Sequence, residues 1–170
     1  MAALVLTVLG DDRPGLVSAV SGVVTSHRAS WEQGQMARLG GKFAGILLVD
    51  APDDRVPALT ADLVALEEEG LRVTVEQAGS PDHQESTRLR LDLLGADRPG
   101  IVAEISAALA DRGVGIEELS TGVREAPMAG GMLFEARAVL AAPPAVGGDE
   151  LRRVLEALAD ELMVDLSLSD

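Results

Sequence analysis

Cysteine is absent from this chain of 170 residues, which excludes disulfides, thiolate nucleophiles and cysteine-based zinc sites. Aromatic residues make up 2% of the chain and include no tyrosine, which argues against the exposed stacking surfaces of RNA-recognition modules. Lysine and arginine total 14 against 28 acidic residues, so the formal net charge of −14 repels a phosphate backbone. We therefore expect no direct contact with nucleic acid.

Long apolar runs and paired histidines are also missing. No stretch approaches the roughly 18 apolar residues of a membrane-spanning helix, and the first residues lack the basic segment of a signal peptide. The two histidines, His27 and His83, are not in metal-ligand spacing with each other or with another donor. We expect a cytoplasmic protein with no membrane contact, no bound metal, no other cofactor and solvated histidines.

The chain does contain enough apolar material for a packed core, because 47% of its residues are hydrophobic and only 25% are charged. Its length fits one domain or two units of roughly 80 residues. An internal repeat favours two units. Residues 9–21 read LGDDRPGLVSAVS and residues 94–106 read LGADRPGIVAEIS, 85 positions further along. This similarity indicates a duplication.

Between the two copies, residues 79–86 contain turn-forming and polar residues and no apolar ones. An exposed connection between domains has this composition. We therefore predict a first domain over residues 1–79, a linker over residues 80–86 and a second domain over residues 87–170.

Each half shows the same series of hydrophobic patterns. An alternating strand, over residues 3–9 and again over 88–93, leads through Arg-Pro-Gly into apolar residues at helical spacing. A hairpin with a double-glycine turn, a second helical pattern and a final alternating strand follow. The order βαββαβ, found twice, predicts an α+β chain of two ferredoxin-like modules, each a four-stranded antiparallel sheet with both helices on one face. The residues expected to face the cores are Leu16, Val20, Val23, Val24, Val56, Leu59, Leu63, Leu66, Leu71, Val73, Val75, Leu89, Leu91, Leu93, Ile101, Ile105, Ala108, Leu109, Leu151, Val154, Leu155, Leu158, Leu162, Val164, Leu166 and Leu168.

The strand, the Asp-Arg-Pro-Gly turn and the helix, inside a βαββαβ unit of this length, resemble the ACT domain, a small-molecule sensor attached to many enzymes of amino-acid metabolism. The resemblance spans nearly the whole chain. Two ACT copies with nothing else, together with residues 36–45 and 126–131, are similar to the glycine cleavage system transcriptional repressor family. That resemblance implies a regulator of glycine or one-carbon metabolism that binds a small amino acid, with glycine or serine favoured, and contacts a protein partner such as a transcription factor.

The two Asp-Arg-Pro-Gly turns are the candidate ligand sites. Each proline suits the first position of a helix, and each following glycine leaves backbone N–H groups bare at the helix N-terminus, where a ligand carboxylate can bind. Each aspartate either caps the helix or pairs with the ammonium group of the same ligand. The same residues also make ordinary turn and capping chemistry, so a purely structural turn is the alternative.

The ACT resemblance implies ligand contacts at the turn and at one position early in the second strand of each module. The implied ligand-binding residues are Asp12, Arg13, Pro14, Gly15, Leu16, Trp31, Asp97, Arg98, Pro99, Gly100, Ile101 and Ile116. The copies differ at Asp11/Ala96 and at Trp31/Ile116, which leaves open whether both pockets bind. Trp31 is the only tryptophan, and a role as core or interface filler is its alternative.

An enzyme needs a nucleophile, a base or metal ligands that converge on one place. No histidine or lysine stands near the candidate aspartates and serines, so we expect no catalysis. The alternative to a sensor is a ligand-independent adaptor that dimerises through its ACT sheets. Small units bury additional area when they associate, so we expect a homodimer. Residues 126–131 lengthen the second hairpin and are either a plain loop or a partner contact.

Overall fold

The chain folds into two compact units, Met1–Pro81 and Asp82–Asp170, called unit 1 and unit 2 below. The computed structural model describes residues 1–79, 85–128 and 130–169. Most of the predicted linker, residues 80–84 with His83, lies outside the described residues. Within the described ranges, no helix is long and apolar enough to cross a membrane.

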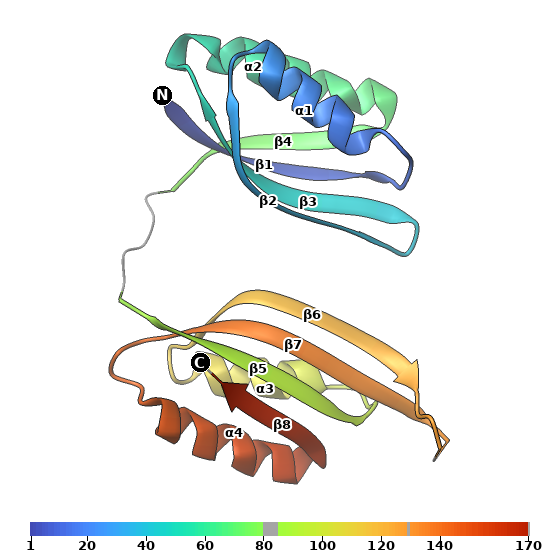
Figure 1. Ribbon diagram of the computed structural model, residues 1–170, viewed down its shortest axis with the longest axis vertical. Coiled ribbons are helices and arrows are strands. Elements are labelled where there is room, and N and C mark those ends of the chain that lie inside the picture. The colour runs from blue at the N-terminus through green and yellow to red at the C-terminus, as the bar shows by residue number, and fades with distance from the viewer. Residues whose placement is uncertain (80–84, 129, 170) are drawn as a thin grey trace. The chain divides into compact units, whose positions relative to one another are not determined.

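The two units have the same order of strands and helices (Figure 1). Unit 1 contains β1 (Ala2–Asp11), α1 (Leu16–Ser26), β2 (Ser30–Leu39), β3 (Lys42–Ala51), α2 (Val56–Ala65) and β4 (Leu71–Gln77), with short 3-10 helices η1 (Asp53–Arg55) and η2 (Leu66–Glu69). Unit 2 contains β5 (Thr87–Ala96), α3 (Ile101–Ala110), β6 (Gly115–Glu125), β7 (Met132–Ala142), α4 (Gly148–Leu162) and β8 (Val164–Ser169). The strand orders are β2-β3-β1-β4 and β6-β7-β5-β8, all antiparallel. Both helices of each unit lie on one face of its sheet, so the predicted α+β fold of two ferredoxin-like modules is confirmed.

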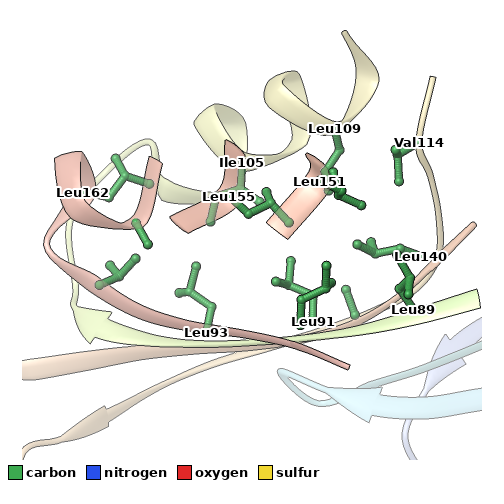
Figure 2. Close-up of a cluster of buried hydrophobic side chains, with 14 of the residues drawn as sticks. Leu89, Leu91, Leu93, Ile105, Leu109, Val114, Leu140, Leu151, Leu155 and Leu162 are labelled. Carbon is green, nitrogen blue, oxygen red and sulfur yellow. The ribbon is translucent and has the colours of Figure 1, made fainter. Parts of the chain in front are cut away.

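Alternating leucines on the central strand build the core of each unit. Figure 2 shows Leu89, Leu91 and Leu93 of β5 pointing from the sheet toward α3 and α4. In unit 1, Leu6 of β1 is 0% exposed in the equivalent core. Each fully buried leucine contributes about 1.5–3 kcal/mol relative to an exposed one. All the residues predicted to face the cores do so except Ala108 and Val154, which are half-buried at the margin of their helices and lie outside the core cluster. The core-facing residues that are half-buried are Val23, Val56, Val75, Leu158 and Leu166.

The two central hairpins differ in length. β2 and β3 are joined by Gly40 and Gly41, whose φ angles of 57° and 77° fit a two-residue type I′ turn. β6 and β7 are joined by the longer segment 126–131, in which residue 129 is not described. Met128 in this segment is 98% exposed.

The sheet faces that the helices leave uncovered differ in chemistry. Ile46 lies on this face of unit 1 and is 57% exposed. The corresponding face of unit 2 carries ion pairs between neighbouring strands, Arg137 with Asp92 at 3.6 Å and Arg124 with Glu135 at 3.3 Å. The uncovered face of unit 1 therefore exposes Ile46 and also carries the cross-strand ion pair of Lys42 with Asp11, whereas that of unit 2 carries the pairs Arg137–Asp92 and Arg124–Glu135.

Candidate functional site

The two Asp-Arg-Pro-Gly turns connect the first strand of each unit to its first helix. We call residues 12–15 the first turn and residues 97–100 the second turn. α1 begins at Leu16 and α3 at Ile101, so Pro14 and Pro99 each stand two residues before a helix. The prediction that these prolines occupy the first helical position is wrong.

The glycine of each turn, and not the proline, adjoins the helix. Gly15 has φ 93° and ψ −1°, and Gly100 has φ 96° and ψ −8°. These values match the second corner of a type II turn, which favours proline at the first corner and glycine at the second. The carbonyls of the two glycines accept the first helical hydrogen bonds from the N–H groups of Ala19 and Glu104, both at 2.9 Å. Pro-Gly therefore forms the corner, and the glycine serves as the N-cap.

The aspartates do not cap the helices, which corrects one of the two roles predicted for them. A capping side chain belongs to the N-cap residue itself, and that position is a glycine in both units. The backbone N–H of Asp12 donates to the Gly41 carbonyl, and that of Asp97 donates to the Met132 carbonyl, both at 2.9 Å. The Asp12 carboxylate also lies 3.6 Å from the Arg38 guanidinium. Each aspartate is thus held against the neighbouring hairpin.

The arginines of the two turns have different partners. In unit 1, Nη2 of Arg13 donates to the Glu69 carbonyl at 2.7 Å, at the end of η2. In unit 2, Arg98 binds Glu104 with two hydrogen bonds, from Nη1 to Oε1 at 3.0 Å and from Nη2 to Oε2 at 3.1 Å. These hydrogen bonds raise the pKa of Arg98 above its ordinary value and hold the pKa of Glu104 below its ordinary value.

The Glu104 carboxylate stands directly over the second turn. A Cβ placed on Gly100 would lie 3.3 Å from Glu104 Oε1 and 3.9 Å from Arg98 Nη1. A Cβ placed on Gly15 would meet no atom of the described residues within 4 Å beyond its chain neighbours. The repeat aligns Glu104 with Ala19, which has no carboxylate to offer. The first turn is therefore open, and the second is bordered by a carboxylate of its own unit, although no side-chain hydrogen bond caps either helix.

The second-strand positions lie at the far end of each sheet from the turn. Trp31 pairs with Val49 of β3, which pairs with Leu4 near the start of β1, whereas the first turn follows the end of β1 at Asp11. Seven strand positions separate the two places, about 23 Å at the rise of an extended strand. Ile116 has the equivalent place in unit 2. Within one unit, the structure does not bring these residues together with the turn.

Trp31 and Ile116 have different surroundings although both are next to a β-bulge. The strand register shifts between Trp31 and Gln33 and again between Ile116 and Glu118. The Trp31 ring covers Gly34, where an added Cβ would lie 3.2 Å from Nε1. Ile116 instead borders a small apolar hollow of about 30 Å³ beneath α3. Both side chains are more than one-third exposed, so neither is a core residue.

His27 is not solvated, contrary to the prediction. Its Nε2 lies 2.7 Å from Oδ2 of Asp62 on α2, and only 12% of the histidine side chain is exposed. The residue directly follows α1 as its C-cap, and Asp62 places it beside the second helix, which leaves little of the ring exposed. Among the described residues, no group of three or more His, Cys, Asp and Glu is arranged to hold a metal ion.

A larger open hollow of about 310 Å³ lies on the charged sheet face of unit 2. Its lining residues are Asp92, Leu93, Leu94, Arg124, Glu135, Ala136, Arg137, Asp165, Leu166 and Ser167. None of the predicted ligand-binding residues lines it, so it is separate from the two turns.

Sequence reasoning missed Ala19, Arg38 and Glu104, although the repeat contained the signal for two of them. Aligning the copies pairs Ala19 with Glu104, a charge difference within the first turn of the helix. Arg38 lies 26 residues after Asp12, and only the sheet register brings the two together.

The two units match the same protein family. The ACT domain model matches residues 2–76 and again residues 87–169. The glycine cleavage system transcriptional repressor of Escherichia coli is 23% identical over 168 residues, covering 98% of this chain and 88% of that protein. A UPF0237 protein of Methanopyrus kandleri is 42% identical over 50 residues, which are 29% of this chain and 56% of that protein.

Two crystal structures match over 99% of the chain. An unknown protein from Galdieria sulphuraria has a TM-score of 0.83 and 31% identity, with 97% of that chain covered. A putative glycine cleavage system transcriptional repressor has a TM-score of 0.72 and 21% identity, with 96% covered, and shows the same fold. Because the family model matches both halves, the chain belongs to the ACT domain family, with one ACT domain in each unit.

Proposed function

We propose that this chain is an amino-acid-sensing regulatory protein that controls genes of glycine or one-carbon metabolism by contacting a transcription factor. The two ACT domains and the similarity along 98% of the chain to the Escherichia coli repressor support this function. The net charge of −14 supports action through a protein rather than on DNA directly.

The open first turn is the observation that carries the sensor function. The N–H groups at the start of α1 are not capped by a side chain of the described residues, and the positive end of the helix dipole favours a carboxylate there. Arg38 adds positive charge beside Asp12. The Asp12 carboxylate is 31% exposed and offers a partner for an ammonium group. A free amino acid has both groups, and glycine or serine has no large side chain to place.

A thermal-shift screen of the full chain against the free amino acids tests this function. A ligand that binds only the folded state stabilises it by about 2.7 kcal/mol at a hundredfold excess over Kd. We expect glycine or serine to raise the melting temperature selectively. A flat response across all amino acids would contradict the sensor.

The second candidate is an adaptor that dimerises through its sheets and docks a partner without a ligand. Ile46, which is 57% exposed on the uncovered sheet face of unit 1, and the 98% exposed Met128 favour it. We propose a homodimer in either case, and light scattering tests it. A particle mass of 17.6 kDa, the mass of one chain, would contradict the homodimer.

We also propose that the chain does not catalyse a reaction. Around the two turns, Asp12 and Arg98 are each held in an ion pair, and Arg13 donates to a backbone carbonyl. A nucleophile beside an activating base, which an enzyme of this kind needs, is not found among the described turn residues.

A further inference from the structure

The two turns share a backbone but differ in whether an internal carboxylate occupies them. We propose that Glu104, held by Arg98, closes the second turn to a ligand carboxylate, so that the chain binds one amino acid, at the first turn. This inference rests on the proposed amino-acid site and deepens it by assigning the site to one of the two ACT domains.

Glu104 takes both the space and the charge that a ligand carboxylate would use. Its Oε1 lies 3.3 Å from a Cβ position on Gly100, the residue before α3, without a side-chain hydrogen bond to the start of that helix. A carboxylate in the first turn of a helix interacts favourably with the positive end of the dipole. Its two hydrogen bonds to Arg98 fix it there and occupy the guanidinium edge that a ligand would otherwise approach.

A ligand carboxylate at the second turn would also meet an ionised neighbour. The hydrogen bonds from Arg98 keep the pKa of Glu104 below its ordinary value, so the side chain is negatively charged at neutral pH. Two carboxylates at one place repel each other. Arg98 moreover donates from Nη1 to the Pro99 carbonyl at 3.2 Å, which holds the guanidinium against the turn.

The first turn lacks each of these features. Ala19 stands at the position of Glu104 and ends at Cβ. Arg13 points to the Glu69 carbonyl at 2.7 Å and not to a side chain of α1. No described atom lies within 4 Å of a Cβ position on Gly15 beyond its chain neighbours. The space over the N-terminus of α1 is therefore available to an external carboxylate.

Isothermal titration of the full chain with glycine and with L-serine tests the assignment by counting sites. We expect one site per chain in the unmodified protein and two sites in Glu104→Ala, because removal of the carboxylate opens the second turn. Ala19→Glu reproduces the Arg98–Glu104 spacing with Arg13, so we expect it to weaken binding at least tenfold. The double variant Ala19→Glu/Glu104→Ala should again bind one ligand, now in unit 2.

Two controls separate charge from bulk and from general effects. Glu104→Gln keeps the size of the side chain and removes its charge, so an intermediate affinity at a second site is expected. Glu150→Ala removes an exposed acid from the first turn of α4 and should leave one site. Glu104 is exposed, so its replacement leaves the core intact, and circular dichroism checks that every variant is folded.

The outcomes distinguish this inference from the proposed function. The closed second turn would be contradicted by two equivalent sites in the unmodified chain. It would also be contradicted by one unchanged site in both Glu104→Ala and Ala19→Glu. Either result would remain compatible with the proposed amino-acid sensor. No binding of glycine or serine by the unmodified chain or by Glu104→Ala would overturn the sensor itself.

Discussion

The first and second turns start from the same sequence frame and reach the same backbone, yet they present different surfaces. Gly15 and Gly100 have φ angles of 93° and 96°, and each accepts the first hydrogen bond of its helix. One residue in the following helical turn differs, because Glu104 places a carboxylate beside Gly100 and Ala19 has none to place beside Gly15. The two copies share the backbone conformation of the turn, and the side chains beside it differ.

The sheets show the same division between shared architecture and diverged surface. Both central strands bury alternating leucines or valines against two helices. The uncovered face of unit 1 exposes Ile46, whereas the ion pair Arg137–Asp92 lies between neighbouring strands on the face of unit 2. The two cores share one pattern of buried residues, and the two units differ in their surface residues.

The largest expected effect comes from removing one core leucine from either unit. Leu6→Ala should lower the free energy of unfolding of unit 1 by about 2–5 kcal/mol, and Leu91→Ala should do the same in unit 2. Trp31 is the only tryptophan, so its fluorescence reports on unit 1. In urea titrations we expect Leu6→Ala to shift the fluorescence midpoint and Leu91→Ala to shift only the transition seen by circular dichroism.

Equal shifts of the fluorescence midpoint in both leucine variants would contradict independent units. That result would show that residues 1–79 and 87–170 unfold in one cooperative transition. The two proposed domains would then not be independent folding units.

Replacing either turn glycine with valine should have an intermediate effect on the free energy of unfolding. The two variants also distinguish a loss of stability from a loss of ligand binding. Both glycines have positive φ, so Gly15→Val and Gly100→Val should each cost about 1–3 kcal/mol through backbone strain. We expect similar falls in melting temperature for the two variants. Only Gly15→Val should also lose the thermal shift produced by glycine or serine, because only the first turn is open. Loss of that shift in Gly100→Val instead would reverse the assignment.

The smallest expected effect is the pH dependence of two exposed ion pairs, one in each unit. Hydrogen bonding to Lys42 lowers the pKa of Asp11, and hydrogen bonding to Arg98 lowers the pKa of Glu104. A lowered pKa in the folded state stabilises the fold above the ordinary values of 3.8 and 4.5, and this contribution disappears as the pH falls through the lower folded values.

Asp11→Asn and Glu104→Gln should therefore be slightly less stable than the unmodified chain at pH 7 and equally stable in strong acid. Salt screens both pairs because the side chains are exposed, so about 1 M salt should reduce the difference at pH 7. The difference in stability is measured from urea unfolding midpoints, which are followed by tryptophan fluorescence for Asp11→Asn and by circular dichroism for Glu104→Gln. A difference that grows toward acid pH would contradict the direction of these pKa shifts.

Local patterns were sufficient to predict the fold because period-two and helical spacings repeat in both halves. The turns were also found from the repeat, but their conformation was not, because Pro-Gly fits both a helix start and a type II turn. The covering of His27 by α2 and the distance of Trp31 from the first turn depend on tertiary packing and strand register. Neither is contained in the local sequence around those residues.

The most direct test of an open first turn and a closed second turn is an NMR titration of the ¹⁵N-labelled full chain with glycine and with L-serine. The amide signals of Gly15 and Gly100 report on the two helix N-termini separately. We expect the Gly15 signal and its neighbours to shift with saturation while the Gly100 signal stays in place. Equal shifts at both glycines, or a shift confined to Gly100, would contradict an open first turn and a closed second turn.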